Sequence, residues 1–186
     1  MSGMLAPIRT VAPASDLVDL RLVKEHLRID HRDDEFMLGQ LVQAAIDMLD
    51  GWRGILGRCI AAQSWVSFAP ALTDQALPFP QVQSITAVRY LDPAGVEQVL
   101  AASAYRVCED AWGARLLFED ATVLPPVAAR DDAVRIEAVY GPPVVAPALR
   151  TAILFMVAAW YESREGDKSL PPAAEALIAP FRRMAV

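Results

Sequence analysis

The spacing of the apolar residues changes twice along this chain of 186 residues. Between about residues 20 and 52, apolar side chains recur every three or four positions, as on one face of an α-helix. From about residue 63 to 140 they alternate within short runs of β-branched and aromatic residues, which favours strands. Helical spacing returns after residue 146. This order predicts an α+β protein that is mainly a helical bundle, with two N-terminal and two C-terminal helices and a small antiparallel β-module inserted between them.

The N-terminal part is expected to form a helical hairpin over residues 16–60. Residues 1–15 contain two prolines and no periodicity, so we expect an extended arm there. Asp19 is placed to cap a first helix that runs to about Arg28, and Asp33 to cap a second helix after an acidic turn. The apolar stripe of the second helix consists of Leu38, Leu41, Val42, Ala45, Leu49 and Trp52.

The β-module is expected over residues 63–140. Its clearest feature is a hairpin, because the turn residues Asp92, Pro93, Ala94 and Gly95 separate two runs with strand spacing. The expected strands lie near residues 65–68, 82–90, 96–100, 105–107, 115–118 and 133–139.

Two helices and a tail are expected over residues 146–186. Pro147 suits the first position of a long, nearly buried helix, and a last helix begins near Ala173. Pro180 should break that last helix and leave a basic, amphipathic tail. Because the main helices lie upstream, we expect residues 173–186 to be dispensable for folding. The hairpin, the β-module and the C-terminal helices are together expected to form one domain over residues 1–186.

The charge of the chain argues against a nucleic-acid clamp. Its 23 acidic residues outnumber 17 scattered basic residues, for a formal net charge of −6. Binding of duplex DNA needs clustered Lys and Arg to neutralise phosphates. DNA could therefore pass an acidic surface of this kind without being specifically bound.

The cysteines and the apolar runs bear on the cellular compartment. Cys59 and Cys108 lack zinc-binding spacing, and two isolated cysteines favour reduced thiols in the cytoplasm. The first residues do not resemble a signal peptide. The most apolar run, Ala152 to Tyr161, has only ten residues, too few to span a bilayer. We therefore expect a soluble protein that is made in the cytoplasm and does not enter a membrane.

The sequence contains no familiar catalytic motif. It has no nucleophile elbow, phosphate loop, dinucleotide fingerprint or HExxH pair. One cluster could in principle hold a divalent metal: His26, Asp30, His31, Asp33 and Asp34. However, its histidines are five residues apart, and its acids sit where helix capping needs them. We therefore expect no enzyme, no metal and no cofactor. The aromatic residues Trp52, Trp65, Phe155 and Trp160 are expected in the core.

A series of short motifs resembles one family in order and spacing. The first helix ends in Val-Lys-Glu-His-Leu-Arg-Ile-Asp, and an acid-rich turn follows it. The motifs are Leu20–Asp30, Asp50–Gly54, Gly57–Arg58, Gln63–Trp65, Pro80–Asp92, Gly95–Glu97, Tyr105–Val107, Tyr140–Gly141, Trp160–Glu165 and Leu177–Arg182. Over residues 16–183 the chain resembles the head–tail connector (adaptor) proteins of tailed phages and of phage-like gene transfer agents. Asp19 stands where the family often has Ser or Thr, which preserves capping.

The resemblance implies a structural subunit of a virion or phage-like particle, located where head meets tail and assembled in the bacterial cytoplasm. Such subunits form a ring, expected to contain twelve copies, beneath the portal protein. A tail-proximal stopper or tail-completion protein would bind the opposite face, and packaged DNA would pass through the channel. The residues that the resemblance assigns to the portal contact are Leu177, Pro180, Phe181, Arg182 and Arg183. The hairpin tip, with Asp92, Pro93 and Gly95, is assigned to a neighbouring subunit or the channel.

Two alternatives stay open at this point. The chain could be another tail-completion or interaction protein of similar architecture, which would differ only in its partner. It could also be a small metal-dependent enzyme that uses the His26–Asp34 cluster. On physical grounds alone, Arg182 and Arg183 could either complement the negative end of the last helix or dock on an acidic partner.

Overall fold

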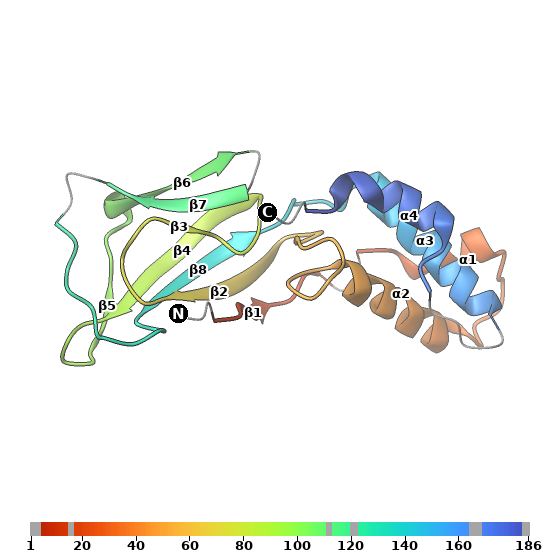
Figure 1. The fold of residues 1–186 in the computed structure, drawn as a ribbon. Helices are drawn as coiled ribbons and strands as arrows, with labels where there is room; N and C mark the ends of the chain where they lie inside the picture. Colours follow the sequence, from red (N-terminus) through yellow and green to blue (C-terminus); the bar gives the residue numbers. More distant parts are fainter. Residues whose placement is uncertain (1–4, 15–16, 111–112, 120–122, 164–168, 184–186) are drawn as a thin grey trace. The chain divides into compact units, whose positions relative to one another are not determined.

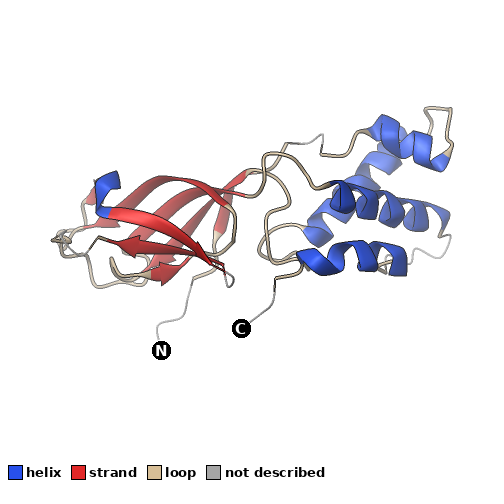
Figure 2. Cartoon of the chain, turned by 90° about the horizontal axis from the view of Figure 1, so that it is seen from above, coloured by secondary structure: helices blue, strands red, loops and turns tan. Residues whose placement is uncertain are grey.

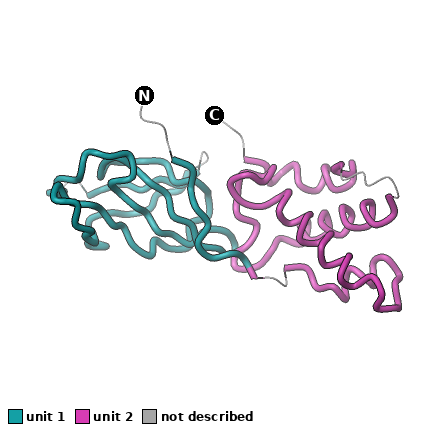
Figure 3. Tube along the Cα trace, turned by 90° about the horizontal axis from the view of Figure 1, so that it is seen from below, with its two compact units in different colours: residues 1–13, 62–142, 186 teal, residues 14–61, 143–185 magenta. Residues whose placement is uncertain are grey.

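The structure is a computed structural model that describes residues 5–14, 17–110, 113–119, 123–163 and 169–183. Within these residues the chain forms four α-helices, two short 3-10 helices and eight strands. It divides into two compact units, and the division is drawn in Figure 3. One unit, the sheet unit, comprises residues 1–13 and 62–142, and the other, the helical unit, comprises residues 14–61 and 143–185. Figure 2 shows that the sheet unit holds the strands and the helical unit the α-helices.

The sheet unit is built on a five-stranded antiparallel sheet (Figure 1). Its strands, from one edge to the other, are β1 (Ile8–Val11), β2 (Gln63–Ala69), β8 (Val134–Tyr140), β4 (Val82–Leu91) and β5 (Glu97–Val99). Strands β2 and β8 pair without interruption from Gln63 opposite Tyr140 to Ala69 opposite Val134. The central strands therefore come from opposite ends of the expected β-module and hold the unit together.

A three-stranded antiparallel sheet completes this unit. It consists of β3 (Gln75–Ala76), β7 (Gly113–Phe118) and β6 (Tyr105–Asp110). Glu109 of β6 accepts a hydrogen bond from the backbone N–H of Val82, at the start of β4, at 2.6 Å. The rings of Trp65 and Tyr140 both meet the ring of Phe79 edge-on, at centroid distances of 4.8 and 5.4 Å. This aromatic cluster is buried and gives the sheet unit a core of its own.

The helical unit consists of α1 (Leu20–Leu27), α2 (Glu35–Leu49), α3 (Pro147–Glu162) and α4 (Pro172–Ile178). Asp19 caps α1 as expected, because its carboxylate accepts a hydrogen bond from the backbone N–H of Arg21 at 2.8 Å. The second cap is Asp34 rather than Asp33, and its side chain makes no capping hydrogen bond. Pro147 takes the first turn of α3, where the missing N–H costs nothing. The four helices bury one continuous apolar cluster.

The prediction of a mainly helical bundle is wrong. Helices occupy 31% and strands 27% of the described residues, and the strands form two antiparallel sheets. The β part is therefore not a small insertion. Two strands were missed because they are too short to show alternation: β1, expected as an extended arm, and β3. The pairing of β1 with β2 joins residues more than 50 positions apart, and the local spacing of residues in the sequence does not predict such a contact.

Of the four aromatic residues expected in the core, Trp52 is the exception. Helix α2 ends at Leu49, so the helical stripe stops before Trp52, which is 39% exposed. Trp65 and Trp160 are buried, and Phe155 is partly buried against the helical core. Among the described residues, no helix is both long enough and apolar enough to cross a membrane.

Candidate functional site

The C-terminal segment, residues 177–183, is the first candidate contact surface. Helix α4 ends at Ile178 and continues as one 3-10 turn, Ala179–Phe181. Pro180 explains the change, because it has no N–H for the next helical hydrogen bond and its ring blocks the preceding turn. The segment thus leaves the helix axis just before the two arginines expected to contact the portal.

Part of this segment is anchored and part is exposed. Leu177 and Phe181 are half-buried and pack on the helical core, whereas Pro180 and Arg182 are exposed. Arg182 donates to the carboxylate of Glu175 at 3.2 Å, an exposed ion pair of small energetic value. The backbone N–H of Arg183 donates to the carbonyl of Leu56 at 3.0 Å. The segment is therefore held against the loop that follows α2.

That loop, residues 50–58, has a fixed shape. The buried carboxylate of Asp50 accepts from the backbone N–H of Ile60 at 2.8 Å, and the N–H of Gly51 donates to the carbonyl of Arg58 at 2.9 Å. The N–H of Ile55 also donates to Met48, in the last turn of α2, at 2.9 Å. A Cβ on Gly54 would lie 2.4 Å from two backbone oxygens, so the loop folds tightly onto the helix end.

Arg58 lies in this loop beside the C-terminal segment. Its side chain is half-buried, and its buried Nε–H has no hydrogen-bond acceptor among the described residues. Burial lowers the pKa of Arg58, and the positive charge of Arg183 lowers that pKa further. Two like charges thus lie close together, and an acidic group beside Arg58 would stabilise its charged form.

The hairpin tip between β4 and β5 is the second candidate surface, and it belongs to the sheet unit. The Asp92 carboxylate accepts from the backbone N–H groups of Ala94 and Val96, at 2.9 and 3.0 Å. These bonds, led by that of Val96, lower the pKa of Asp92. Gly95 takes a positive φ of 81°, which glycine adopts without strain. The turn thus forms at the residues expected for it, and Pro93 and Gly95 are exposed at its tip.

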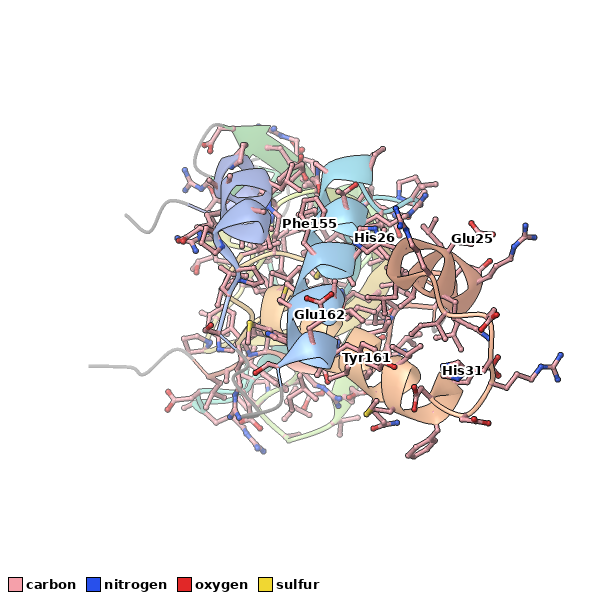
Figure 4. The ribbon with its side chains drawn as sticks, turned by 90° about the vertical axis from the view of Figure 1, so that its right-hand side faces the viewer. Glu25, His26, His31, Phe155, Tyr161 and Glu162 are labelled. Atoms are coloured by element: carbon pink, nitrogen blue, oxygen red, sulfur yellow. The ribbon has the colours of Figure 1, made fainter. Side chains whose placement is uncertain are left out.

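The structure brings only part of the His26–Asp34 cluster together: Nε2 of His31 lies 4.0 Å from the Asp34 carboxylate, whereas His26 contacts another helix (Figure 4). The ring of His26 lies on that of Phe155 at a centroid distance of 5.8 Å, whereas His31 lies near the start of α2. Asp34 accepts a hydrogen bond from the hydroxyl of Tyr161 at 2.6 Å, which raises the pKa of Tyr161. In the part of the chain that the structure describes, no three His, Cys, Asp or Glu side chains are grouped so that they could hold a metal ion.

An open groove of about 650 Å³ runs along α1 on this side of the helical unit. Lys24 crosses it and donates to Glu35 at 2.7 Å, which lowers the pKa of Glu35. The other lining residues are Leu20, Arg21, Glu25, Arg28, Ile29 and Asp30. Charged side chains that line the groove thus pair with one another, and among the described residues their arrangement does not resemble a catalytic site.

The chain was compared with known proteins in three ways. The sequence matches no protein-family model, and no curated protein matches it significantly. Solved structures, in contrast, match almost end to end. A chain in the neck of an empty gene transfer agent particle, computed with C6 symmetry, has a TM-score of 0.78 and 22% sequence identity. The match covers 98% of this chain and 97% of that one.

Two further structures agree with this result. A chain in the virion of a native gene transfer agent particle has a TM-score of 0.76, and one in the neck of a native particle, computed with C12 symmetry, has a TM-score of 0.75. Both are 23% identical to this chain, with the same coverage of 98% and 97%. The whole chain, including both units, therefore has the fold of a chain found in gene transfer agent particles.

Proposed function

We propose that this chain is a structural subunit of the neck of a phage-like particle. In this proposal it forms an adaptor ring beneath the portal and joins the DNA-filled head to the tail. The observation that carries the proposal is the end-to-end similarity of fold to chains of gene transfer agent particles. The motifs along residues 16–183 support the same reading independently.

A ring requires each copy to contact the next through two different surfaces, with a rotation that closes. The C6 and C12 symmetries of the similar neck structures support assembly into a ring, and we propose that this ring contains twelve copies. In our proposal the portal contact comes from the C-terminal segment, with Leu177, Pro180, Phe181, Arg182 and Arg183. The hairpin tip, with Asp92, Pro93 and Gly95, contacts a neighbouring copy or faces the channel. A stopper or tail-completion protein binds the opposite side.

The net charge of −6 fits a passage for DNA better than a DNA-binding protein. Packaged DNA would pass through the channel without specific binding. The role we propose is accordingly mechanical, without catalysis or a cofactor, and it is exercised in the assembled particle rather than at a membrane.

Deleting the gene in a host that makes the particles tests this proposal. We expect DNA-filled heads and separate tails in electron micrographs, and we expect the wild-type gene to restore joined particles. A tagged copy of the chain should be found between capsid and tail. Normal particles from the deletion strain would contradict the proposal, and a tag located along the tail would instead favour the tail-completion alternative.

A further inference from the structure

The loop of residues 50–58 has the properties of a preformed docking surface. Trp52 and Ile55 are exposed by 39% and 42%, although both are apolar and lie in a loop fixed by backbone hydrogen bonds. Covering exposed apolar side chains with a partner contributes favourable binding free energy, and Trp and Arg are enriched among the residues that contribute most to binding at interfaces. Because the loop is already rigid, binding would cost little conformational entropy.

Arg58 indicates the chemistry of that partner. Among the described residues the buried Nε–H of Arg58 has no acceptor, and an unpaired buried donor of this kind is costly and rare in proteins. The nearby charge of Arg183 adds repulsion. Glu175 is already engaged by Arg182 at 3.2 Å. A carboxylate supplied from outside would not reach the buried Nε–H itself, but it would bind the rest of the half-buried guanidinium and offset the charge of Arg58.

We infer that residues 50–58 and Arg183 form one docking surface for an acidic segment of a partner protein, whose carboxylate binds Arg58 and whose apolar residues cover Trp52 and Ile55. This inference rests on the proposed function and extends it. The C-terminal segment lies on this loop through the bond from Arg183 to Leu56, so the partner is the portal ring that the segment is proposed to contact. A protein partner is favoured over DNA because a phosphate backbone would leave the two apolar side chains uncovered.

The test uses DNA-filled heads purified from the deletion strain and the purified full-length chain with single substitutions. Co-sedimentation measures how tightly each variant binds the heads. We expect Arg58→Glu to weaken binding by about tenfold or more, because it removes the cation and repels the acid. The matched control is Arg32→Glu, an exposed arginine of the same unit that lies outside the loop and the C-terminal segment, and its binding should stay within about twofold of wild type. Trp52→Ala should also weaken binding by about tenfold.

The outcomes separate the inference from the proposed function. If the wild-type chain does not bind heads, the proposed function fails. If it binds and Arg58→Glu binds equally well, the inference is overturned while the function stands. Equal losses for Arg32→Glu and Arg58→Glu would mean a general charge effect and would also overturn the inference. The inference would also be overturned if the wild-type chain binds short duplex DNA and Arg58→Glu abolishes that binding. In that case the anion that Arg58 binds would be a phosphate. Circular dichroism checks folding, and Arg58→Gln, which removes the charge without reversing it, should reproduce the loss of binding if Arg58→Glu does not fold.

Discussion

Gly54 shows how strongly a single position can determine the proposed docking loop. An added Cβ there would lie 2.4 Å from the carbonyl oxygens of Leu49 and Asp50, neither of which can move without disturbing the end of α2. Gly39, within α2, has nothing within 4 Å of the same position. The two glycines therefore serve opposite purposes, although the sequence alone does not distinguish them.

Substitution by alanine should separate the two glycines. We expect Gly54→Ala to destabilise the protein by roughly 1–3 kcal/mol, because the clash forces the backbone to shift. Gly39→Ala should stabilise it by about 0.5–1 kcal/mol, because alanine loses less entropy in a helix. Urea denaturation of both variants measures the two free energies of unfolding. A neutral Gly54→Ala would show that the loop is less rigid than its hydrogen bonds indicate.

Asp92 makes the shape of the hairpin tip dependent on pH. Its carboxylate accepts several hydrogen bonds in the folded chain, so its pKa is lower folded than unfolded. The contribution of these bonds is present at neutral pH and is lost as the pH falls through the folded pKa. As the pH is lowered, we expect the amide NMR shifts of Ala94 and Val96 to stay constant through the range in which an ordinary aspartate titrates. At still lower pH the two shifts should change together. In Asp92→Asn this step should be absent, and a wild-type step at the ordinary pKa would contradict the assignment.

At the scale of elements, α4 contributes more to the helical unit than its seven residues suggest. Ala174 and Ile178 are fully buried and belong to the core shared with α1, α2 and α3. The indole Nε1–H of Trp160, in α3, donates to the carbonyl of Ser169, in the connection to α4, at 2.9 Å. These contacts lead us to expect that this segment is needed for folding, whereas the sequence had led us to expect that residues 173–186 are dispensable.

We expect Ile178→Ala to cost roughly 2–5 kcal/mol of stability, as large-to-small changes in a core do. Leu177→Ala, at a half-buried neighbouring position, should cost clearly less. Removal of residues 173–186 should then unfold the helical unit rather than merely abolish docking. Circular dichroism and denaturant unfolding would check all three variants, and a truncated chain with native helix content would show that α4 packs only loosely.

The elements that could be predicted from sequence are those with strong local signals. The capped α1, the long α2 and α3, and the β4–β5 hairpin each contain enough periodic residues or turn residues to be recognised. The missed strands β1 and β3 depend on pairing with distant residues. The proposed docking loop was missed for a related reason. Trp52 continues the helical spacing of α2 in sequence, whereas the tight turn at Gly51 and Gly54 takes it out of the helix.

At the scale of the whole molecule, the chain contains two cores rather than one. The sheet unit is centred on Phe79 and Tyr140, and the helical unit on side chains such as Ile153 and Met156. The polypeptide passes between the units three times along residues 13–143. With two cores, a disturbance of one need not open the other.

Trp160→Ala tests whether the two cores are independent. Trp160 is only 3% exposed, so its truncation should destabilise the helical unit by roughly 3–5 kcal/mol. Native-state hydrogen exchange should show this loss at buried positions of α3, such as Ile153 and Met156. Amides of β8, such as those of Ile136 and Ala138, should keep their protection to within about 0.5 kcal/mol, because they belong to the core of the other unit. Equal losses in α3 and β8 would mean that the two units unfold as one cooperative body, which would contradict the independence of the two cores.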